Sequence, residues 1–118
     1  MFQDKLQTKY IGKVDKIKNY ELTAPLVYRG HTVPIGFKTN LASIPIWIKW
    51  INRKFYYWLK FITKRPSVLH DYLYESDIPR KRCDKIYQEA LDSEDINPFI
   101  VDTFYLAVRL FGGKNYGN

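Results

Sequence analysis

The chain has 118 residues, a formal net charge of +7 and a single cysteine, Cys83. This length fits one domain with one core, and a lone cysteine excludes an internal disulfide or a multi-cysteine zinc site. The polar N-terminus shows no signal peptide, and no apolar run approaches the roughly 18 residues of a membrane-spanning helix. We therefore expect synthesis in a cytoplasm.

The positive charge is unevenly distributed along the chain. Eight basic residues and no acidic residue lie between Leu22 and His70, whereas nine acidic and six basic residues follow from Asp71 onward. This separation of charge gives the molecule an electric dipole. The dipole favours an anionic partner on one face, with membrane headgroups, nucleic acid or an acidic protein as alternatives. A lysine-rich, solvated surface without a partner is the other interpretation.

Residues 9–40 are predicted to be β-rich. Apolar and polar residues alternate across Pro25, and Arg29-Gly30-His31 predicts a turn between strands at 26–28 and 32–35. We expect residues 36–40 to leave this small antiparallel sheet or hairpin.

Residues 46–111 are predicted to be helical. Proline and cap residues divide them into about four helices, at 46–63, 66–74, 79–91 and 98–111. Asn97 is expected to cap the last helix, and residues 112–118 are expected to form a flexible tail or an arm that orders on a neighbouring subunit. The chain is thus predicted to be a single α+β domain, 1–118, with a small N-terminal antiparallel sheet followed by a helical bundle.

The first predicted helix combines aromatic and basic residues. Its polar stripe consists of Lys49, Asn52, Arg53, Tyr56, Lys60 and Lys64. Apolar side chains cover the remainder, which leaves four interpretations: a core helix with a solvated stripe, or a surface for a protein, a membrane or nucleic acid. Because the aromatic residues are expected opposite the charges, nucleic-acid stacking is disfavoured. Trp47, Lys49 and Arg53 are the candidate binding residues.

His70 and Asp71 are the candidate chemical site, because an imidazole beside a carboxylate is typical of acid/base chemistry or metal ligation. Adjacent residues do not face each other on a helix, so each is expected to have a different partner. Five residues separate this helix from the next, which predicts antiparallel packing and places Asp84 against His70. The functional interpretation is a His70/Asp84 acid/base pair with Asp71 as metal ligand or second carboxylate. The alternative is a buried polar network.

Two motifs in order carry a resemblance to a known family. The first runs from Val33 through Gly36-Phe37-Lys38-Thr39-Asn40-Leu41-Ala42-Ser43-Ile44-Pro45, and the second is Leu69-His70-Asp71-Tyr72-Leu73-Tyr74. Arg80 to Asp84 and Val108-Arg109-Leu110-Phe111-Gly112 follow. Over roughly residues 20–113 the chain resembles a family of small proteins of tailed bacteriophages and prophages, catalogued as domain of unknown function 1353.

This resemblance implies a phage protein made in the host cytoplasm, with other phage proteins as partners and a place in the virion as one expectation. It marks Asn40, Ser43, Tyr74 and Arg80 as candidate binding residues beside the His-Asp pair. The family has an aspartate where this chain has Asn40. An asparagine can ligate calcium through its carbonyl oxygen but cannot act as a base.

The His-Asp-x-x-Tyr order is also similar to the helix of secreted phospholipases A2, in which the histidine activates water and the aspartate binds calcium. The glycine-rich calcium loop and the disulfides of that family are missing here.

Two functional hypotheses follow. The first is a phage accessory protein without catalysis, acting as a virion, tail or host-interaction component. The second is a small metal-assisted hydrolase of amides or esters, directed at cell wall or lipid. In it, His70 oriented by Asp84 activates water, and Asp71 binds calcium or zinc. The loss of charge at Asn40 favours the first.

Overall fold

The computed structural model describes residue 2 and residues 5–14, 17–41, 44 and 46–116. Its strands are β1 (Thr8–Val14), β2 (Ile17–Leu22), β3 (Leu26–Tyr28), β4 (His31–Val33) and β5 (Lys38–Thr39). Its helices are α1 (Ile46–Ile51), α2 (Arg53–Ile62), α3 (Lys64–Tyr74), α4 (Arg80–Ser93), α5 (Pro98–Phe111) and the 3₁₀ helix η1 (Gly112–Asn115). The predicted α+β fold, a small antiparallel sheet region followed by a helical bundle, is confirmed.

Within the described residues, the β region forms two small antiparallel sheets, ordered β1-β2-β5 and β3-β4. The β3-β4 hairpin turns at Arg29 and Gly30, whose φ angles of 42° and 82° fit a two-residue turn with left-handed central residues. The expectation that residues 36–40 leave the sheet was wrong, because Thr39 pairs with Tyr20 and Lys38 with Glu21. This third strand fixes the chain immediately before Asn40.

The predicted helix 46–63 is two helices. Asn52 adopts an extended conformation with φ −151°, and its side-chain oxygen accepts a hydrogen bond from the Phe55 amide at 3.0 Å. This is the N-cap arrangement, so one helix ends before Asn52 and the next begins after it. The bundle therefore has five α-helices among the described residues rather than about four.

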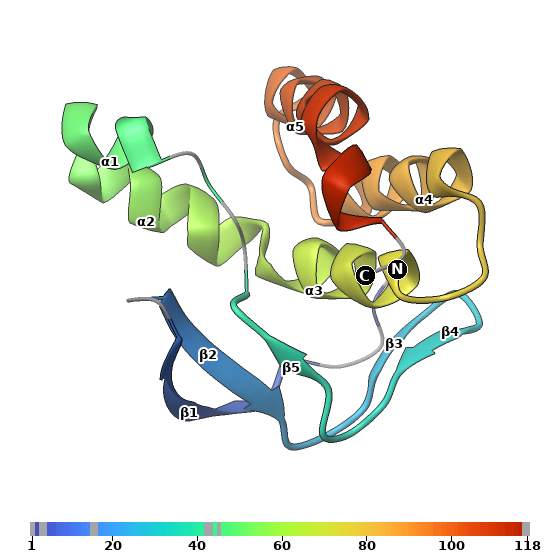
Figure 1. Cartoon of the computed structure of the whole chain (residues 1–118). Helices are drawn as coiled ribbons and strands as arrows, with labels where there is room; N and C mark the ends of the chain where they lie inside the picture. Colours follow the sequence, from blue (N-terminus) through green and yellow to red (C-terminus); the bar gives the residue numbers. More distant parts are fainter. Residues whose placement is uncertain (1, 3–4, 15–16, 42–43, 45, 117–118) are drawn as a thin grey trace.

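The core lies between the sheets and the C-terminal helices, with α3 in the middle (Figure 1). Leu22, Leu26 and Val33 of the strands pack on one side of α3, in one apolar cluster with Val68, Leu69 and Leu73 of α3 and with Cys83, Ile86 and Ala90 of α4. Residues 66–70 of α3 are all buried. The polar side chains of a helix this deeply buried must find hydrogen-bond partners within the protein. The partner of His70 therefore locates the polar site of the domain.

The C-terminal segment is more structured than the sequence predicts. Asn97 caps α5 as expected, with its side chain accepting from the Phe99 amide at 2.8 Å. Instead of a flexible tail from Gly112, η1 follows, and the Tyr116 hydroxyl donates to the Ile78 carbonyl at 2.6 Å. Among the described residues, no helix combines the length and apolar character needed to cross a bilayer.

Candidate functional site: a buried carboxylate and its histidine

The site is built where α3, α4 and α5 meet. Pro66 lies in the first turn of α3, where its missing amide proton is tolerated, and Pro79 directly precedes α4. The short connection makes α3 and α4 neighbours, as predicted. His70 on α3 therefore reaches Asp84 on α4.

Asp84 is the centre of the site and is completely buried. Its Oδ1 accepts hydrogen bonds from His70 Nε2 at 2.7 Å and from the Tyr74 hydroxyl at 2.5 Å. Its Oδ2 accepts from Arg109 Nη1 at 2.7 Å. Burial raises the pKa of Asp84, but the bonds from His70, Tyr74 and Arg109 outweigh it and hold the pKa below its ordinary value. Asp84 is therefore ionised at neutral pH.

This arrangement fixes the tautomer of His70. An ionised carboxylate can only accept, so Nε2 of His70 must carry the proton that lies between them. When the imidazole is neutral, Nδ1 is then the basic nitrogen, and no hydrogen bond joins it to another described residue. The ring lies against Tyr74 and Tyr87, with centroid distances of 4.1 Å and 4.6 Å. The imidazole of His70 is thus held in one orientation by Asp84 and the two tyrosine rings.

A small cavity of about 110 Å³ borders this histidine. It is lined by Ser67, His70, Asp71, Tyr74, Tyr87, Val108 and Gly112. A second cavity, of about 250 Å³, is lined by Asn19, Phe37, Lys38, Thr39, Asn40, Asp71, Tyr74 and Glu75. Asp71 and Tyr74 belong to both, so together they separate a small inner space from a larger outer one.

Asp71 has an unusual environment for a carboxyl group. Burial raises its pKa to about 7, and the negative charge of Glu75 adds to the effect. No hydrogen bond or ion pair joins its side chain to another described residue. At neutral pH the group is therefore present both as an acid and as a carboxylate. Perturbed groups of this kind in a cleft are typical of functional sites.

Two arginines complete the cluster, and one was missed by sequence reasoning. Arg109 forms the ion pair with Asp84, although its sequence position was noted only as part of the last family motif. Arg80, a predicted binding residue, donates instead to the carbonyls of Val108 and Arg109 at 2.8 Å and 2.7 Å. It thereby satisfies the C-terminal end of α5. Arg80 positions the site and lines neither cavity.

The other predicted binding residues divide into two groups. Asn40 lines the outer cavity with Asp71, as the two-motif pattern suggested. Ser43 lies outside the described residues. Trp47, Lys49 and Arg53 belong to α1 and α2, and none of them lines either cavity.

The predicted divalent cation does not fit these donors. Among the described residues, no group of three or more histidine, cysteine, aspartate or glutamate side chains could hold a metal ion. The carboxyl groups at the outer cavity are Asp71 and Glu75, beside the neutral amide of Asn40. Zinc needs three or four nitrogen, sulfur or carboxylate ligands, and calcium needs six to eight oxygens.

The fold and site define an α+β domain in which three helices converge on one buried carboxylate. The chain belongs to the family of proteins of unknown function DUF1353, which matches residues 20–108 and so confirms the family that the motifs indicate. The match includes His70, Asp71, Tyr74 and Asp84 and ends one residue before Arg109. No curated protein and no solved structure was found to match the chain.

Proposed function

We propose that the His70 site is an acid/base centre that hydrolyses an ester or amide bond. The observation that carries this proposal is the shared inner cavity, where a histidine oriented by an ionised aspartate lies beside a carboxyl group with a pKa of about 7. In this arrangement the base is His70, whose Nε2 bonds to Asp84, and the acid is the protonated form of Asp71.

In this reaction, Nδ1 of His70 takes a proton from a water molecule in the inner cavity. The water oxygen then bonds to the carbonyl carbon of the substrate. Asp84 keeps the Nε2 proton and stabilises the positive charge that the imidazole acquires. The inner cavity is too small for more than a few waters or an acyl group, so the bulk of the substrate would occupy the outer one.

Asp71 has the complementary role. In its protonated form it donates to the leaving oxygen or nitrogen as the bond to the carbonyl carbon breaks. The proton taken up by His70 then returns to Asp71 through solvent and restores both groups. Tyr74 remains a hydrogen-bond donor throughout, since burial and its bond to Asp84 raise the pKa of its hydroxyl.

The test is hydrolysis of a series of methyl esters of increasing acyl length, whose alkoxide leaving group needs a proton, with His70→Gln and Asp71→Asn beside the unmodified protein. General acid/base groups contribute about 100-fold to 10,000-fold, so each variant should lose at least about 100-fold in kcat/KM. Asp102→Asn, on the exposed surface of α5, is the matched control and should keep full activity. Folded variants that turn over as fast as the unmodified protein would exclude the proposal, and so would an unmodified protein without activity on any ester.

A second function is favoured by the burial of the cluster. Only 6% of the His70 surface is exposed, and Asp84 has none. A polar network this enclosed also serves to hold three helices in register, without catalysis. In this version the chain is a phage-encoded virion, tail or host-interaction component with other phage proteins as partners. Finding the chain by mass spectrometry in purified particles would support it, and absence from particles would contradict it.

A further inference from the structure

The outer surface of α1 and α2 exposes large apolar side chains. Trp50 and Ile51, at the end of α1, are 79% and 77% exposed. The others are Trp47, Phe55, Tyr57, Trp58 and Phe61. From the sequence, most of this set was placed on the wide apolar face of one long helix, opposite its basic stripe. The break at Asn52 and the packing of α2 reverse that assignment.

The reversal has a simple geometric cause. The inward side of α2 is formed by Tyr56 and Leu59, which pack with Ile44 in a small apolar cluster. At 100° per residue, Lys54 and Phe61 lie on the opposite side of the helix from Tyr56 and Leu59, and Arg53 lies on the flank between the two sides. All three are exposed. Aromatic and basic side chains therefore share one surface instead of lying on opposite faces.

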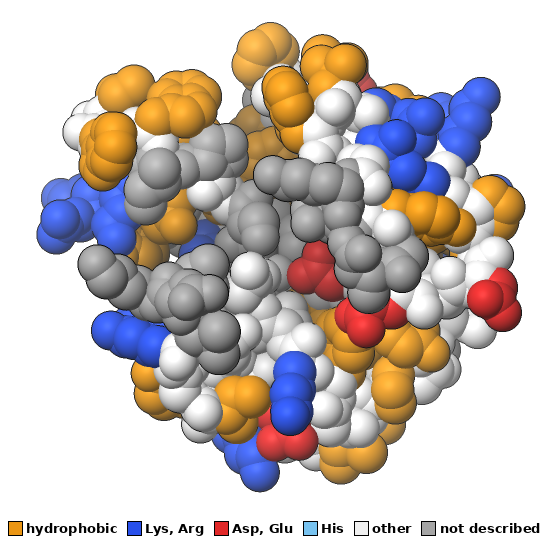
Figure 2. Space-filling model, viewed as in Figure 1, with side chains coloured by type: hydrophobic (Ala, Val, Ile, Leu, Met, Phe, Trp, Pro, Cys, Tyr) orange, Lys and Arg blue, Asp and Glu red, His pale blue; other side chains and the backbone are white. Residues whose placement is uncertain are grey.

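The charge of this surface is entirely positive. No acidic residue occurs between Leu22 and His70. Lys49 lies over the rings of Tyr56 and Tyr57 at 5.7 Å and 5.3 Å, so its charge stays within the aromatic surface. Figure 2 shows hydrophobic side chains over α1 and α2 at the upper left, with basic side chains directly beneath them. No acidic side chain is visible in that part of this face.

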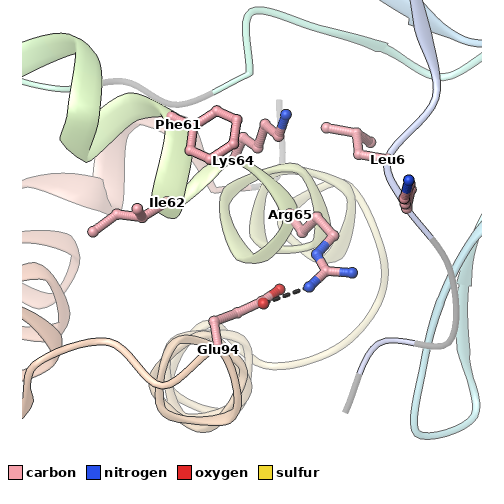
Figure 3. Close-up of a pocket in the computed structure, with 7 residues that line it drawn as sticks. Leu6, Phe61, Ile62, Lys64, Arg65 and Glu94 are labelled. Carbon is pink, nitrogen blue, oxygen red and sulfur yellow. Dashed lines mark hydrogen bonds and ion pairs between the residues drawn. The ribbon is translucent and has the colours of Figure 1, made fainter.

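A cavity extends this surface beyond the end of α2. It measures about 530 Å³ and is lined by Lys5, Leu6, Phe61, Ile62, Lys64, Arg65 and Glu94 (Figure 3). Glu94 pairs with Arg65 at 2.5 Å, so Lys5 and Lys64 leave the lining with a net positive charge. The walls formed by Leu6, Phe61 and Ile62 are apolar. Positive charge above apolar walls suits an anionic headgroup with its first methylene groups.

From these observations we propose that the α1–α2 surface docks on an anionic lipid bilayer. Trp50 and Ile51 would enter the boundary between headgroups and acyl chains, while Arg53 and Lys54 contact the headgroups. Tryptophan and lysine on an amphipathic helix are the composition of interfacial binding. Nucleic acid is the less suitable partner, because Ile51 is as exposed as Trp50 and an aliphatic side chain neither stacks on a base nor contacts a phosphate. The proposal is independent of the chemistry at His70.

The experiment is co-sedimentation of the full chain with phospholipid vesicles. One set is pure phosphatidylcholine, and the other contains about 30 mol% phosphatidylglycerol, a proportion that gives a strongly negative surface. The chain should sediment with the anionic vesicles only, and binding should weaken as salt rises. Equal binding to both sets, or none to either, would overturn the proposal.

Apolar variants test the tip of α1. Trp50→Ser with Ile51→Ser should weaken binding to anionic vesicles by at least about tenfold, because both side chains partition into the interface. Ile35→Ser is the matched control. Ile35 is 63% exposed, in the connection between β4 and β5, and its loss should change binding by less than about twofold. The proposal fails if the control and the tip variants lose the same amount.

Charge variants test the other half of the surface. Arg53→Glu with Lys54→Glu should reduce binding by at least about tenfold, since each basic residue near an anionic surface contributes severalfold. Lys81→Glu with Arg82→Glu, on the exposed side of α4, makes the same change in net charge elsewhere and should have a smaller effect. An equal loss of binding in both pairs would mean that the net charge of the chain, and not the α1–α2 surface, attracts it to anionic vesicles, and this would overturn the proposal. Tighter binding of an oligodeoxythymidine than of the vesicles, lost in the tip variants, would identify nucleic acid instead.

Discussion

The raised pKa of Asp71 predicts that this residue destabilises the fold at neutral and alkaline pH. The folded chain holds the proton up to about pH 7, whereas the unfolded chain releases it near the ordinary value of 3.8. Below about pH 4 both states are protonated, so the residue has no effect on the free energy of unfolding. Between about pH 4 and 7 the folded state binds more protons, so stability falls as pH rises; above 7 the penalty is constant.

The magnitude follows from the difference between the two pKa values. About 3 pKa units at 1.36 kcal/mol each correspond to about 4 kcal/mol. Asp71 is only half-buried and borders two cavities, so solvent screening reduces the expected penalty to about 2–3 kcal/mol. Asp71→Asn keeps the shape and removes the titration. The variant should therefore match the unmodified protein near pH 4 and exceed its stability by about 2–3 kcal/mol at about pH 8.

Urea unfolding followed by tryptophan fluorescence, from about pH 4.5 to about pH 8, measures this difference. The lowered pKa of Asp84 acts below this range and does not contribute to it. Other titrating groups are common to both proteins and cancel in the comparison. A stability difference that does not change with pH, or a variant less stable at about pH 8, would refute the reasoning. A variant that is more stable but inactive would show that the site has been maintained at the expense of stability.

Three further predictions concern the buried cluster. Asp84→Asn should destabilise the fold by about 3 kcal/mol in urea unfolding, because it removes the ion pair with Arg109 and leaves the buried donors of His70 and Tyr74 with a weaker acceptor. Exposed Asp102→Asn should stay within about 0.5 kcal/mol, and equal effects would contradict the central role of the carboxylate. Gly112→Ala places a methyl group 2.9 Å from the tyrosine hydroxyl of the cluster and should cost about 1–2 kcal/mol in the same assay. Gly113→Ala, whose nearest neighbour lies at 3.5 Å, should be neutral, and a neutral Gly112→Ala would show that the tyrosine moves aside at little cost. Cys83, fully buried with a pKa raised to about 11, should react with a thiol reagent only after unfolding, and rapid labelling of the folded chain would be inconsistent with its burial.

The pairing of His70 with Asp84 was predictable because it depends on local rules. A five-residue connection makes two helices antiparallel neighbours, and helical spacing selects the facing residues. The ion pair with Arg109 was not predictable in this way. It joins α4 to α5 across 25 positions, and no periodicity links the two residues. The only signal was the position of Arg109 in the last family motif.

The exposure of α1 and α2 illustrates a different limit. An aromatic-rich helix can bury either of two faces, and the choice depends on what the rest of the chain offers for packing. Here Asn52 interrupts the helix, and Ile44 and α5 occupy the side formed by Tyr56 and Leu59. The short strand β5 was missed for a related reason. Its two residues pair with β2, which is distant in sequence, and carry no alternation of their own.

The Asp84 cluster also sets the order in which the fold can close. Until α5 docks, Arg109 is absent, and the buried carboxylate keeps only the hydrogen bonds from His70 and Tyr74 and the longer contact with Arg80, at 4.0 Å. Docking of α3 on α4 should therefore remain incomplete in a nascent chain that ends before α5. For the same reason, a fragment cut to the residues that match the family, 20–108, would lose the guanidinium one position beyond its end. The cooperative unit of this domain is longer than the segment by which its family is recognised.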